Sequence, residues 1–525
     1  MKFLLVNPPY PRAEIPSPPL GLAYIAAVLE EEGYSVQVQD FVVNKYSKEK
    51  IKEKYNEYTP DIVGTTAVTM TFNDASDILK YYKEESPDIF TVIGGPHVTF
   101  DAVNTLSKHP HIDMVVMGEG ERTIIEIADN LENGRSFNKI RGIAFRENGE
   151  VTITKPRPLI QDLKNLPYPA RHLLPLNKYQ ALDLPITIIT SRGCPHKCIF
   201  CVGSKMVGGK VRFYDPVRVV DEIEMVMKEG FKKVNIVDDL FTANKKHAFA
   251  VCDEIMKRGI EVEWGVFARV DTVTPDLLNK MKEAGCSMLL YGVESGNQKI
   301  LDTVKKKITI EKCVKAVKMA KDAGMIPMAS FILGLPGETV DTVDKTLKFG
   351  KDLSASYGFH LLAPFPGTEV REKAEEYGLK ILTNDWRKYD ANCAIVETEG
   401  ISAKELDQVI QDFNALVDEY YVDLKNKYKE GTLEESDVKL VRSATQVDIV
   451  DKMIQNEFLE RQAVFTMNDG ESPEKTLQLI IQRLQDNSNA ESLDIIDTIE
   501  HLYNNHYIVC KSSENKVWWE WKERL

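Results

Sequence analysis

Two series of short apolar segments, each followed by a helical pattern, constrain the fold of this chain more than any other feature. The first series comprises residues 3–6, 36–38, 61–68, 90–94 and 113–117, and the second comprises 186–190, 234–238, 262–267, 288–293, 329–333 and 358–362. Strands that are apolar along their whole length are typical of parallel sheets with helices on both faces. The sequence therefore predicts an α/β protein with two parallel sheets.

The first series predicts a doubly wound, Rossmann-like domain over residues 1–137. Between its first two strands, Leu20, Tyr24, Ala27 and Val28 repeat at helical spacing, and Gly33 ends the helix. Ligands of such sheets bind beyond the carboxyl ends of the strands. We expect three loops there, at residues 7–10, 94–97 and 118–121.

The second series predicts an open, partial (β/α)6 barrel over residues 184–390, because six units are too few for a closed eight-stranded barrel. Residues 138–183 are expected to be a connector with a β-hairpin, whose turn is Asn148-Gly149. Residues 391–525 are expected to be helix-rich. Their end, a helix over Ser492–His506 followed by two strands around a Ser-Glu-Asn turn, resembles a winged-helix unit. A structural, a substrate-covering and a partner-docking role are all open for this domain.

The composition argues against a nucleic-acid-binding protein, a secreted protein and a membrane-spanning protein. The net charge is −14, and residues 438–525 hold ten Lys and Arg against fifteen Asp and Glu, which argues against nucleic-acid binding. The apolar run after Met1 stops at Asn7-Pro8-Pro9, too early for a signal peptide, and no stretch approaches the ~20 apolar residues of a membrane span. We therefore expect a cytoplasmic protein with no transmembrane segment.

Three of the eight cysteines, Cys194, Cys198 and Cys201, lie in one loop directly after the first strand of the second series. Three thiolates on one loop can hold three irons of a cubane cluster, which leaves the fourth iron open to a substrate. A structural zinc site needs a fourth ligand, and His196 inside the loop is poorly placed to provide it. The other cysteines are expected to be small buried side chains: Cys252, Cys286, Cys313, Cys393 and Cys510.

The segment from Ser191 to Cys201 resembles the signature of the radical S-adenosylmethionine (SAM) superfamily, with its Cys-x3-Cys-x2-Cys spacing and an aromatic residue, Phe200, before the third cysteine. The resemblance implies a 4Fe–4S cluster whose open iron chelates SAM. An electron from the cluster then cleaves the C–S bond of SAM to give a 5′-deoxyadenosyl radical. Apolar barrel walls suit such a species, because they exclude water and side reactants.

Residues at the ends of the later barrel strands agree with this resemblance, which implies that they line the SAM site. Glu294 would bind the methionyl ammonium or the ribose, Arg269 the carboxylate, and backbone groups at the turn after Gly334 the adenine. Ordinary structural roles stay open for each of them, such as a helix N-cap for two aspartates. In chain order the implied residues are Asp238, Asp239, Arg269, Glu294, Ser295 and Gly334.

The loops of the first domain resemble those of the cobalamin-binding domain in B12-dependent radical enzymes. That group includes C- and P-methyltransferases and the anaerobic magnesium-protoporphyrin ester cyclase, and the resemblance covers residues 1 to about 390. The chain has no Asp-x-His-x-x-Gly motif, which implies a cobalt without a histidine ligand from that motif. His97 could equally be an ordinary loop residue. The residues implied to bind cobalamin are Pro8, Tyr10, Gly95, His97, Gly118 and Glu119.

The two resemblances together predict a cobalamin-dependent radical SAM methyltransferase that acts on an unactivated carbon. One SAM would methylate cobalamin, and a second would give the radical that abstracts hydrogen from the substrate. The alternatives are a radical oxidative cyclase or C–C coupling enzyme, with or without bound cobalamin, and a non-catalytic cobalamin- or redox-sensing module. The expected partners are an unidentified substrate (small molecule, lipid or protein side chain) and a low-potential electron donor such as flavodoxin or ferredoxin.

Overall fold

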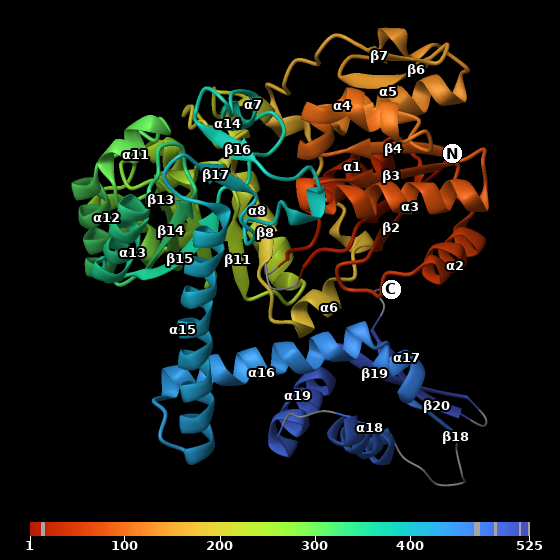
Figure 1. Cartoon of the computed structure of the whole chain (residues 1–525). Helices are drawn as coiled ribbons and strands as arrows, with labels where there is room; N and C mark the ends of the chain where they lie inside the picture. The colour runs from red at the N-terminus through yellow and green to blue at the C-terminus, as the bar shows by residue number, and fades with distance from the viewer. Residues whose placement is uncertain (12–15, 467–472, 488–490, 514–515, 523–525) are drawn as a thin grey trace.

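The N-terminal domain is a seven-stranded sheet in the order β2-β1-β3-β4-β5-β6-β7 (Figure 1) in the computed structural model, which describes residues 1–11, 16–466, 473–487, 491–513 and 516–522. Its first five strands are parallel: β1 (Lys2–Asn7), β2 (Ser35–Asp40), β3 (Ile62–Thr66), β4 (Phe90–Gly94) and β5 (Met114–Val116). Phe3 and Leu5 belong to one hydrophobic core, and Leu4 and Val6 to another. Burial of β1 on both faces explains its continuous apolar run and confirms the doubly wound domain.

Helices occupy both faces of this sheet (Figure 1). They are α1 (Leu20–Glu31), α2 (Lys48–Tyr58), α3 (Phe72–Glu85), α4 (Pro96–Lys108) and α5 (Glu121–Glu132). The loop at residues 7–10 follows the carboxyl end of β1, and the loops that precede α4 and α5 follow the carboxyl ends of β4 and β5. All three expected ligand loops are therefore at this edge of the sheet.

The hairpin of β6 (Ile143–Glu147) and β7 (Glu150–Ile153) extends the same sheet, because β6 pairs antiparallel with β5. This differs from the expectation that the hairpin belongs to a separate connector over residues 138–183. Ile143 and Phe145 are buried in the core of the N-terminal domain. A local turn signal predicts a hairpin but not the sheet edge that the hairpin covers. The rest of the connector contains η4 (Leu163–Asn165), η5 (Arg171–Leu173) and α6 (Leu176–Ala181).

Six parallel strands form the second sheet, with β8 and β15 at its two edges. Its order, β8-β11-β12-β13-β14-β15, is the chain order of an open (β/α)6 barrel and confirms that prediction. The strands are β8 (Ile186–Ile188), β11 (Lys233–Ile236), β12 (Glu263–Ala268), β13 (Cys286–Glu294), β14 (Ile326–Leu333) and β15 (Ser356–Leu361). The helices between them are α8 (Pro216–Lys228), α9 (Lys245–Lys257), α10 (Pro275–Glu283), α11 (Gln298–Thr303), α12 (Ile310–Asp322) and α13 (Val340–Asp352).

Residues 364–400, which we call the strap, lead from the sixth barrel strand across to the N-terminal domain. Gly367 packs against the ring of Phe100 from α4, and the rings of Trp386 and His97 are 4.9 Å apart. The strap thus connects the barrel to the N-terminal domain. It contains α14 (Glu369–Glu372), β16 (Leu379–Ile381), η7 (Trp386–Lys388) and β17 (Val396–Thr398).

The C-terminal region begins with α15 (Ala403–Glu430), which links the barrel to a separate module (Figure 1). Between Ile410 and Leu424, α15 has no buried side chain. The module contains α16 (Glu435–Gln455), α17 (Phe458–Gln462), β18 (Val464–Thr466), α18 (Pro473–Asn487), α19 (Ser492–Asn504), β19 (Ile508–Ser513) and β20 (Lys516–Trp521). Its sheet, β18-β20-β19, has three strands where the sequence suggested two, since β18 is too short to give a clear pattern. Two residues of the expected Ser-Glu-Asn turn, 514 and 515, lie outside the described residues.

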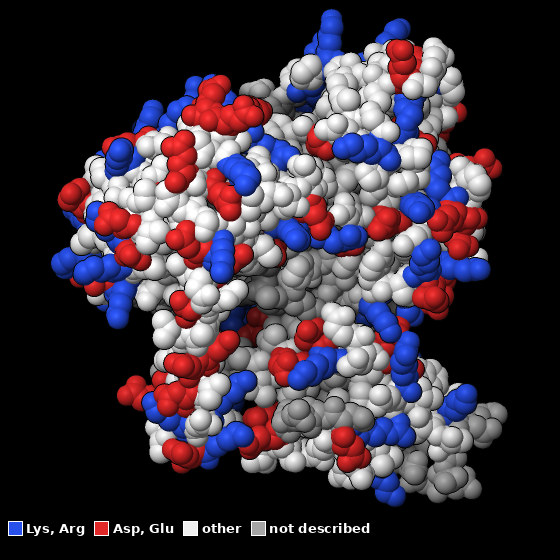
Figure 2. Space-filling model, viewed as in Figure 1, with Lys and Arg blue, Asp and Glu red and all other residues white. Residues whose placement is uncertain are grey.

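This module docks at the amino ends of the barrel strands. Ser443 and Gln446 bond to Asp183 and the carbonyl of Ala181, which precede β8. Figure 2 shows the surface hollowed between the barrel and the module, with acidic and basic side chains interspersed on this face. The module therefore lies at the opposite end of the barrel from the cysteine loop, which does not support a substrate-covering role.

In the described part of the chain, no helix combines the length and the apolar character that crossing a membrane would require.

A substitution at Gly285, at the turn between α10 and β13, can show how closely the barrel is packed there. Its φ is +93°, and a Cβ added there would lie 2.0 Å from the carbonyl oxygen of Val262. Gly134 has φ +59° with open space around an added Cβ. We expect Gly134→Ala to cost about 1 kcal/mol for the left-handed backbone alone, and Gly285→Ala about 2–4 kcal/mol because overpacking is added. Melting temperatures by scanning calorimetry check this, and equal losses would contradict it.

Candidate active site

The three cysteines lie between β9 (Ser191–Arg192) and α7 (Gly203–Met206), beyond the carboxyl end of β8. The backbone of this loop is held from several sides. Cys194 N donates to Gly208 O at 3.2 Å, Ile199 N donates to Val304 O at 3.2 Å, and Ile199 O accepts from Val370 N at 3.0 Å. β9 also pairs with β10 (Arg212–Phe213). The cysteine loop is thus fixed by the barrel, by the end of α11 and by the strap.

Desolvation dominates the titration of the three thiols. It raises the pKa of each, to about 11 at Cys201, so the thiols keep their protons at neutral pH when no metal is bound. Arg269 and Lys306 act in the opposite direction on Cys194 and Cys198. Cluster binding would displace these protons, because a thiolate is the form that binds metal.

Among the described residues, no three His, Cys, Asp or Glu side chains converge on a position for a single metal ion. A cubane cluster does not require convergence, since each thiolate binds a different iron. The residues of this loop therefore fit a 4Fe–4S cluster.

Asp238 and Asp239, at the end of the second barrel strand, hold the start of the cysteine loop. The buried carboxylate of Asp238 accepts four hydrogen bonds of 2.6–3.1 Å, from the backbone N–H and the hydroxyl of both Thr190 and Ser191. Burial raises the pKa of Asp238 to about 6. Asp239 accepts from Gly193 N at 2.9 Å and also lines a cavity. Asp238 thus orients the loop, and Asp239 is the member of the pair that faces open space.

Two ion pairs lie at the ends of β12 and β13, and the pair of Glu294 with Lys306 is buried. Lys306 Nζ lies 2.5 Å from Glu294 Oε1, with both side chains 8% exposed. Arg269 pairs through two nitrogens with Asp271 at 3.0 Å and donates to the carbonyl of Lys306 at 2.9 Å. The structure therefore brings Glu294 and Arg269 together beside the cysteines. Sequence reasoning missed Lys306, because the run Lys305-Lys306-Lys307 reads as a solvated charged surface.

Ser295 and Gly334 lie near these strand ends, and their observed contacts are to α13 and within turns. Ser295 Oγ is 3.1 Å from Thr346 Oγ1 and accepts from Asn297 N at 3.2 Å. Gly334 N donates to Glu338 Oε2 at 2.6 Å. Burial raises the pKa of Glu338 to about 8, so this carboxyl group keeps its proton at neutral pH.

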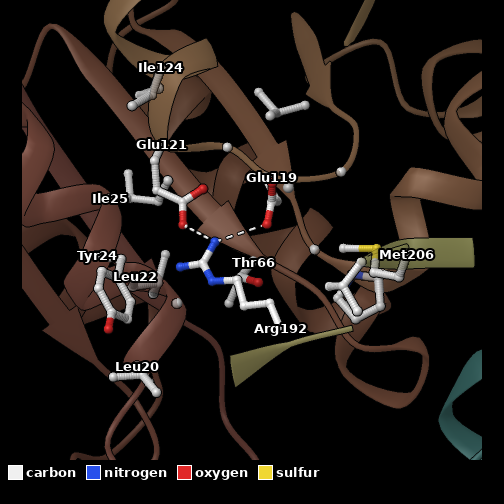
Figure 3. A pocket seen from close by; sticks show the side chains of 18 of the residues that line it. Leu20, Leu22, Tyr24, Ile25, Thr66, Glu119, Glu121, Ile124, Arg192 and Met206 are labelled. Atoms are coloured by element: carbon white, nitrogen blue, oxygen red, sulfur yellow. Dashed lines mark hydrogen bonds and ion pairs between the residues drawn. The ribbon is translucent and has the colours of Figure 1, made fainter. Parts of the chain in front are cut away.

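A cavity of about 370 Å³ separates the N-terminal sheet from the cysteine loop (Figure 3). The N-terminal domain contributes glycines from the carboxyl ends of its strands, and the barrel contributes Ile189, Met206 and Val237. At Gly118, where φ is +76°, an added Cβ would meet nothing within 4 Å and would project into open space. The lining is mostly apolar, with glycines at Gly21, Gly64, Gly94, Gly95, Gly118 and Gly120. This cradle at the strand ends fits the apolar ring face of a bulky group such as cobalamin.

A buried ion network, which we call the interdomain clamp, crosses this cavity (Figure 3). Arg192 Nη1 lies 3.1 Å from Glu119 Oε1 and 2.7 Å from Glu121 Oε1, and Arg212 Nη1 lies 2.9 Å from Glu119 Oε1. Burial lowers the pKa of Arg192, but Glu121, Tyr214 and Glu119 outweigh this and raise it above its ordinary value. The guanidinium is therefore a permanent cation, directly before Gly193 and Cys194 in the chain.

Three of the residues expected to bind cobalamin line the cavity, namely Gly95, Gly118 and Glu119. Glu119 is also occupied by the clamp, whose other members sequence reasoning missed because nothing local reveals a pairing across 73 residues. Pro8, Tyr10 and His97 are not among the lining residues.

His97 turns instead toward the strap and is 1% exposed. Its ring packs 4.3 Å from that of Phe72 and 4.9 Å from that of Trp386. Burial lowers its pKa to about 3, so it is a neutral packing residue.

Comparisons with known proteins agree with this arrangement. Residues 188–350 match the family model of the Radical SAM superfamily, and residues 12–128 match that of the B12 binding domain. The chain is 38% identical over 419 residues to an "uncharacterized methyltransferase" of Pyrococcus horikoshii, an alignment that covers 78% of this chain and 91% of the relative. It is 33% identical over 432 residues to the anaerobic magnesium-protoporphyrin IX monomethyl ester cyclase of Rubrivivax gelatinosus, covering 79% of this chain and 77% of the cyclase.

Among solved structures, OxsB, a cobalamin-dependent SAM radical enzyme with aqua-cobalamin and SAM bound, superposes with a TM-score of 0.69. The match covers 96% of this chain and 84% of OxsB at 17% identity. At this identity the match shows that the two proteins share a fold.

The clamp predicts a specific pattern of stability. Arg192→Met should cost about 3–5 kcal/mol, because Glu121 stays buried without its cation. Glu119 keeps Arg212 in that variant. Adding Glu121→Gln should recover part of the loss, since an amide is cheaper to bury than a carboxylate. Thermal unfolding of the single and double variants measures this, and a double variant no more stable than Arg192→Met would contradict the assignment.

Proposed function

This chain belongs to the family of cobalamin-dependent radical SAM methyltransferases, and on that basis we propose that it transfers a methyl group to an unactivated carbon of its substrate. Its cofactors are a 4Fe–4S cluster, SAM and cobalamin. One observation carries the proposal. The cavity between the domains is walled on one side by the glycine loops of the B12-binding domain and on the other by Ile189, Arg192 and Asp239 from around the cysteine loop. A methyl carrier and a radical source on its two sides would face one substrate.

When bound, the cluster supplies the electron that cleaves SAM, and cobalamin carries the methyl group. The chain's own residues bind and orient. Glu294 and Lys306 together offer the two charges that the methionyl end of SAM needs, a carboxylate for its ammonium and an ammonium for its carboxylate. Arg269 was the expected partner of the SAM carboxylate, but both of its observed ion-pairing nitrogens are held by Asp271. The ammonium of Lys306 has three N–H donors, of which its bond to Glu294 uses one, and we therefore assign the carboxylate of SAM to Lys306.

The reaction also needs an electron from outside the chain. A low-potential donor such as flavodoxin or ferredoxin would supply it, and we place the reaction in the cytoplasm, where such donors and free thiols persist. In the described part of the chain, none of the eight cysteines is in a disulfide, which suits that compartment.

The test is a labelled-methyl experiment with the anaerobically purified holoenzyme, first checked for about four irons and one cobalt per chain. SAM with a carbon-13 methyl group is added with reductant and a metabolite extract from cells that lack the gene. Methyl transfer predicts that S-adenosylhomocysteine and 5′-deoxyadenosine form together and that one extract component gains the label. Cys198→Ser should abolish both 5′-deoxyadenosine and the labelled product.

A second candidate, radical oxidative cyclisation or C–C coupling, is favoured by the 33% identity to the Rubrivivax cyclase. It predicts 5′-deoxyadenosine with neither S-adenosylhomocysteine nor labelled product. That result would overturn the methyltransferase proposal.

The assignment of Lys306 predicts a selective loss of SAM binding. Lys306→Met should raise the Kd for SAM at least about tenfold, because the SAM carboxylate loses a buried cation, whereas Lys306→Arg should retain most of the affinity. Lys307→Met removes an exposed charge one residue away and is the matched control. Calorimetric titration of SAM into each cluster-loaded variant measures the effect. Equal Kd values for Lys306→Met and Lys307→Met would contradict the assignment.

A further inference from the structure

We infer that the substrate of this enzyme is an apolar molecule, uncharged around its reacting carbon, that binds on the inner face of the barrel sheet. This inference rests on the proposed function, since it concerns the substrate of the same site. The side chains that face the inside of the barrel provide the evidence.

Side-chain alternation and register identify the inner face. A Cβ added at Gly350 of α13 would lie 3.2–3.3 Å from the rings of Phe331, Tyr357 and Phe359, so these residues face the covering helices. Successive residues of a strand point to opposite faces, so Ser330 and Gly358 point inward. The register places Gly292 opposite Ser330, and Ser330 opposite Gly358.

An apolar band crosses this inner face one level below the small residues Gly292, Ser330 and Gly358. Phe267 aligns with Leu290, and Leu290 with Met328. The Phe267 side chain is 45% exposed, whereas the helix-facing aromatic residues Trp264, Tyr291 and Phe331 are buried. An aromatic ring open to solvent inside a barrel is a surface that an apolar ligand would cover.

The next row of inward-facing residues, toward the amino ends of the strands, is also uncharged. A Cβ added at Gly265 would lie 3.2 Å from both Asn235 Oδ1 and Met288 Cε, so these three residues share the inner face. Together with Ser330, Asn235 offers hydrogen bonds without charge, and the thioethers of Met288 and Met328 adapt to the shape of a ligand.

The charged side chains around the inner face determine whether a charged substrate can bind there. Across the described strands, the inner face has no Lys or Arg between the level of Asn235 and that of Gly292. At the level of Gly292, Lys306 is paired with Glu294 and Arg269 with Asp271. Lys233, at the amino end of β11, is paired with Asp183, and His360 lies exposed on the edge strand β15. A phosphate or carboxylate on the apolar band would therefore be desolvated without an unpaired cation beside it, which is unfavourable.

The inner face is continuous with the cavity between the domains. Ile189 and Val237, which follow β8 and β11, line that cavity, and Val237 is one residue beyond Ile236, which aligns with Val266 next to Phe267. A molecule on the apolar band would thus reach from the barrel toward the cobalamin cradle, past the cysteine loop.

The test compares two probes with the same rings, neutral 2-naphthalenemethanol and anionic 2-naphthoate, by fluorescence titration of the anaerobic holoenzyme. We expect the alcohol to bind at least about tenfold more tightly than the carboxylate, and Phe267→Ala to weaken the alcohol by about tenfold. Met328→Lys should shift the preference toward the carboxylate. Val314→Lys, at a half-exposed site on α12, is the matched control and should change neither Kd.

Iron content and melting temperature verify that each variant is folded, and the exposed position of Phe267 makes Phe267→Ala the safer of the two. Equal affinities for the two probes, tighter binding of the carboxylate by the unaltered enzyme, or no binding of the alcohol would overturn the inference. These titrations measure no methyl transfer. A failed labelled-methyl experiment with an intact alcohol preference would therefore reject the proposed reaction, and not the character of the inner face.

Discussion

The interdomain clamp is the interaction on which both halves of the site depend. Glu119 lies in the loop after β5 and Glu121 begins α5, on one wall of the cavity, and Arg192 lies two residues before the first cysteine. Charges of this kind are costly to bury and persist only when each is paired in good geometry. Any movement of the N-terminal domain relative to the cysteine loop would break pairs that have no water to replace them. The cavity and the cluster loop are therefore positioned as one unit.

The strap secures the same interface from the other side. It packs Gly367 on Phe100 and Trp386 on His97, and its Arg387 forms ion pairs with Asp74 and Asp77 of α3. His97 shows how a residue in a ligand loop can serve packing: Gly95 of the same loop faces the cavity, while His97 turns toward Trp386. A neutral imidazole suits that position, because burial disfavours its protonation. The clamp and the strap thus both hold the N-terminal domain against the barrel.

Much of the architecture could be predicted from sequence, because its signals are local. Apolar strands bounded by helical patterns gave both sheets, and the spacing of Cys194, Cys198 and Cys201 gave the cluster loop. Pairings between distant positions could not be predicted, such as Arg192 with Glu119 and Glu121 or Lys306 with Glu294. An isolated charge carries no local mark of its partner, and Lys306 lies in a run of lysines typical of a solvated surface. The same limit explains the hairpin of β6 and β7, whose turn was evident but whose place at the edge of β5 depends on tertiary contacts.

The exposed middle of α15 has a consequence for how the length of this chain can vary. Residues 411–423 are held in a helix with no buried side chain, so the spacing between barrel and module is set by the helix itself. One inserted residue would advance the module by about 1.5 Å and rotate it by about 100°. Such a rotation would separate Ser443 from Asp183 and Glu457 from Lys50 at once. A whole added turn would restore the rotation but move the module by about 5.4 Å, which is longer than either contact. The contacts at the two ends of the helix therefore fix its length, and we expect no insertion or deletion in this segment that keeps the module docked.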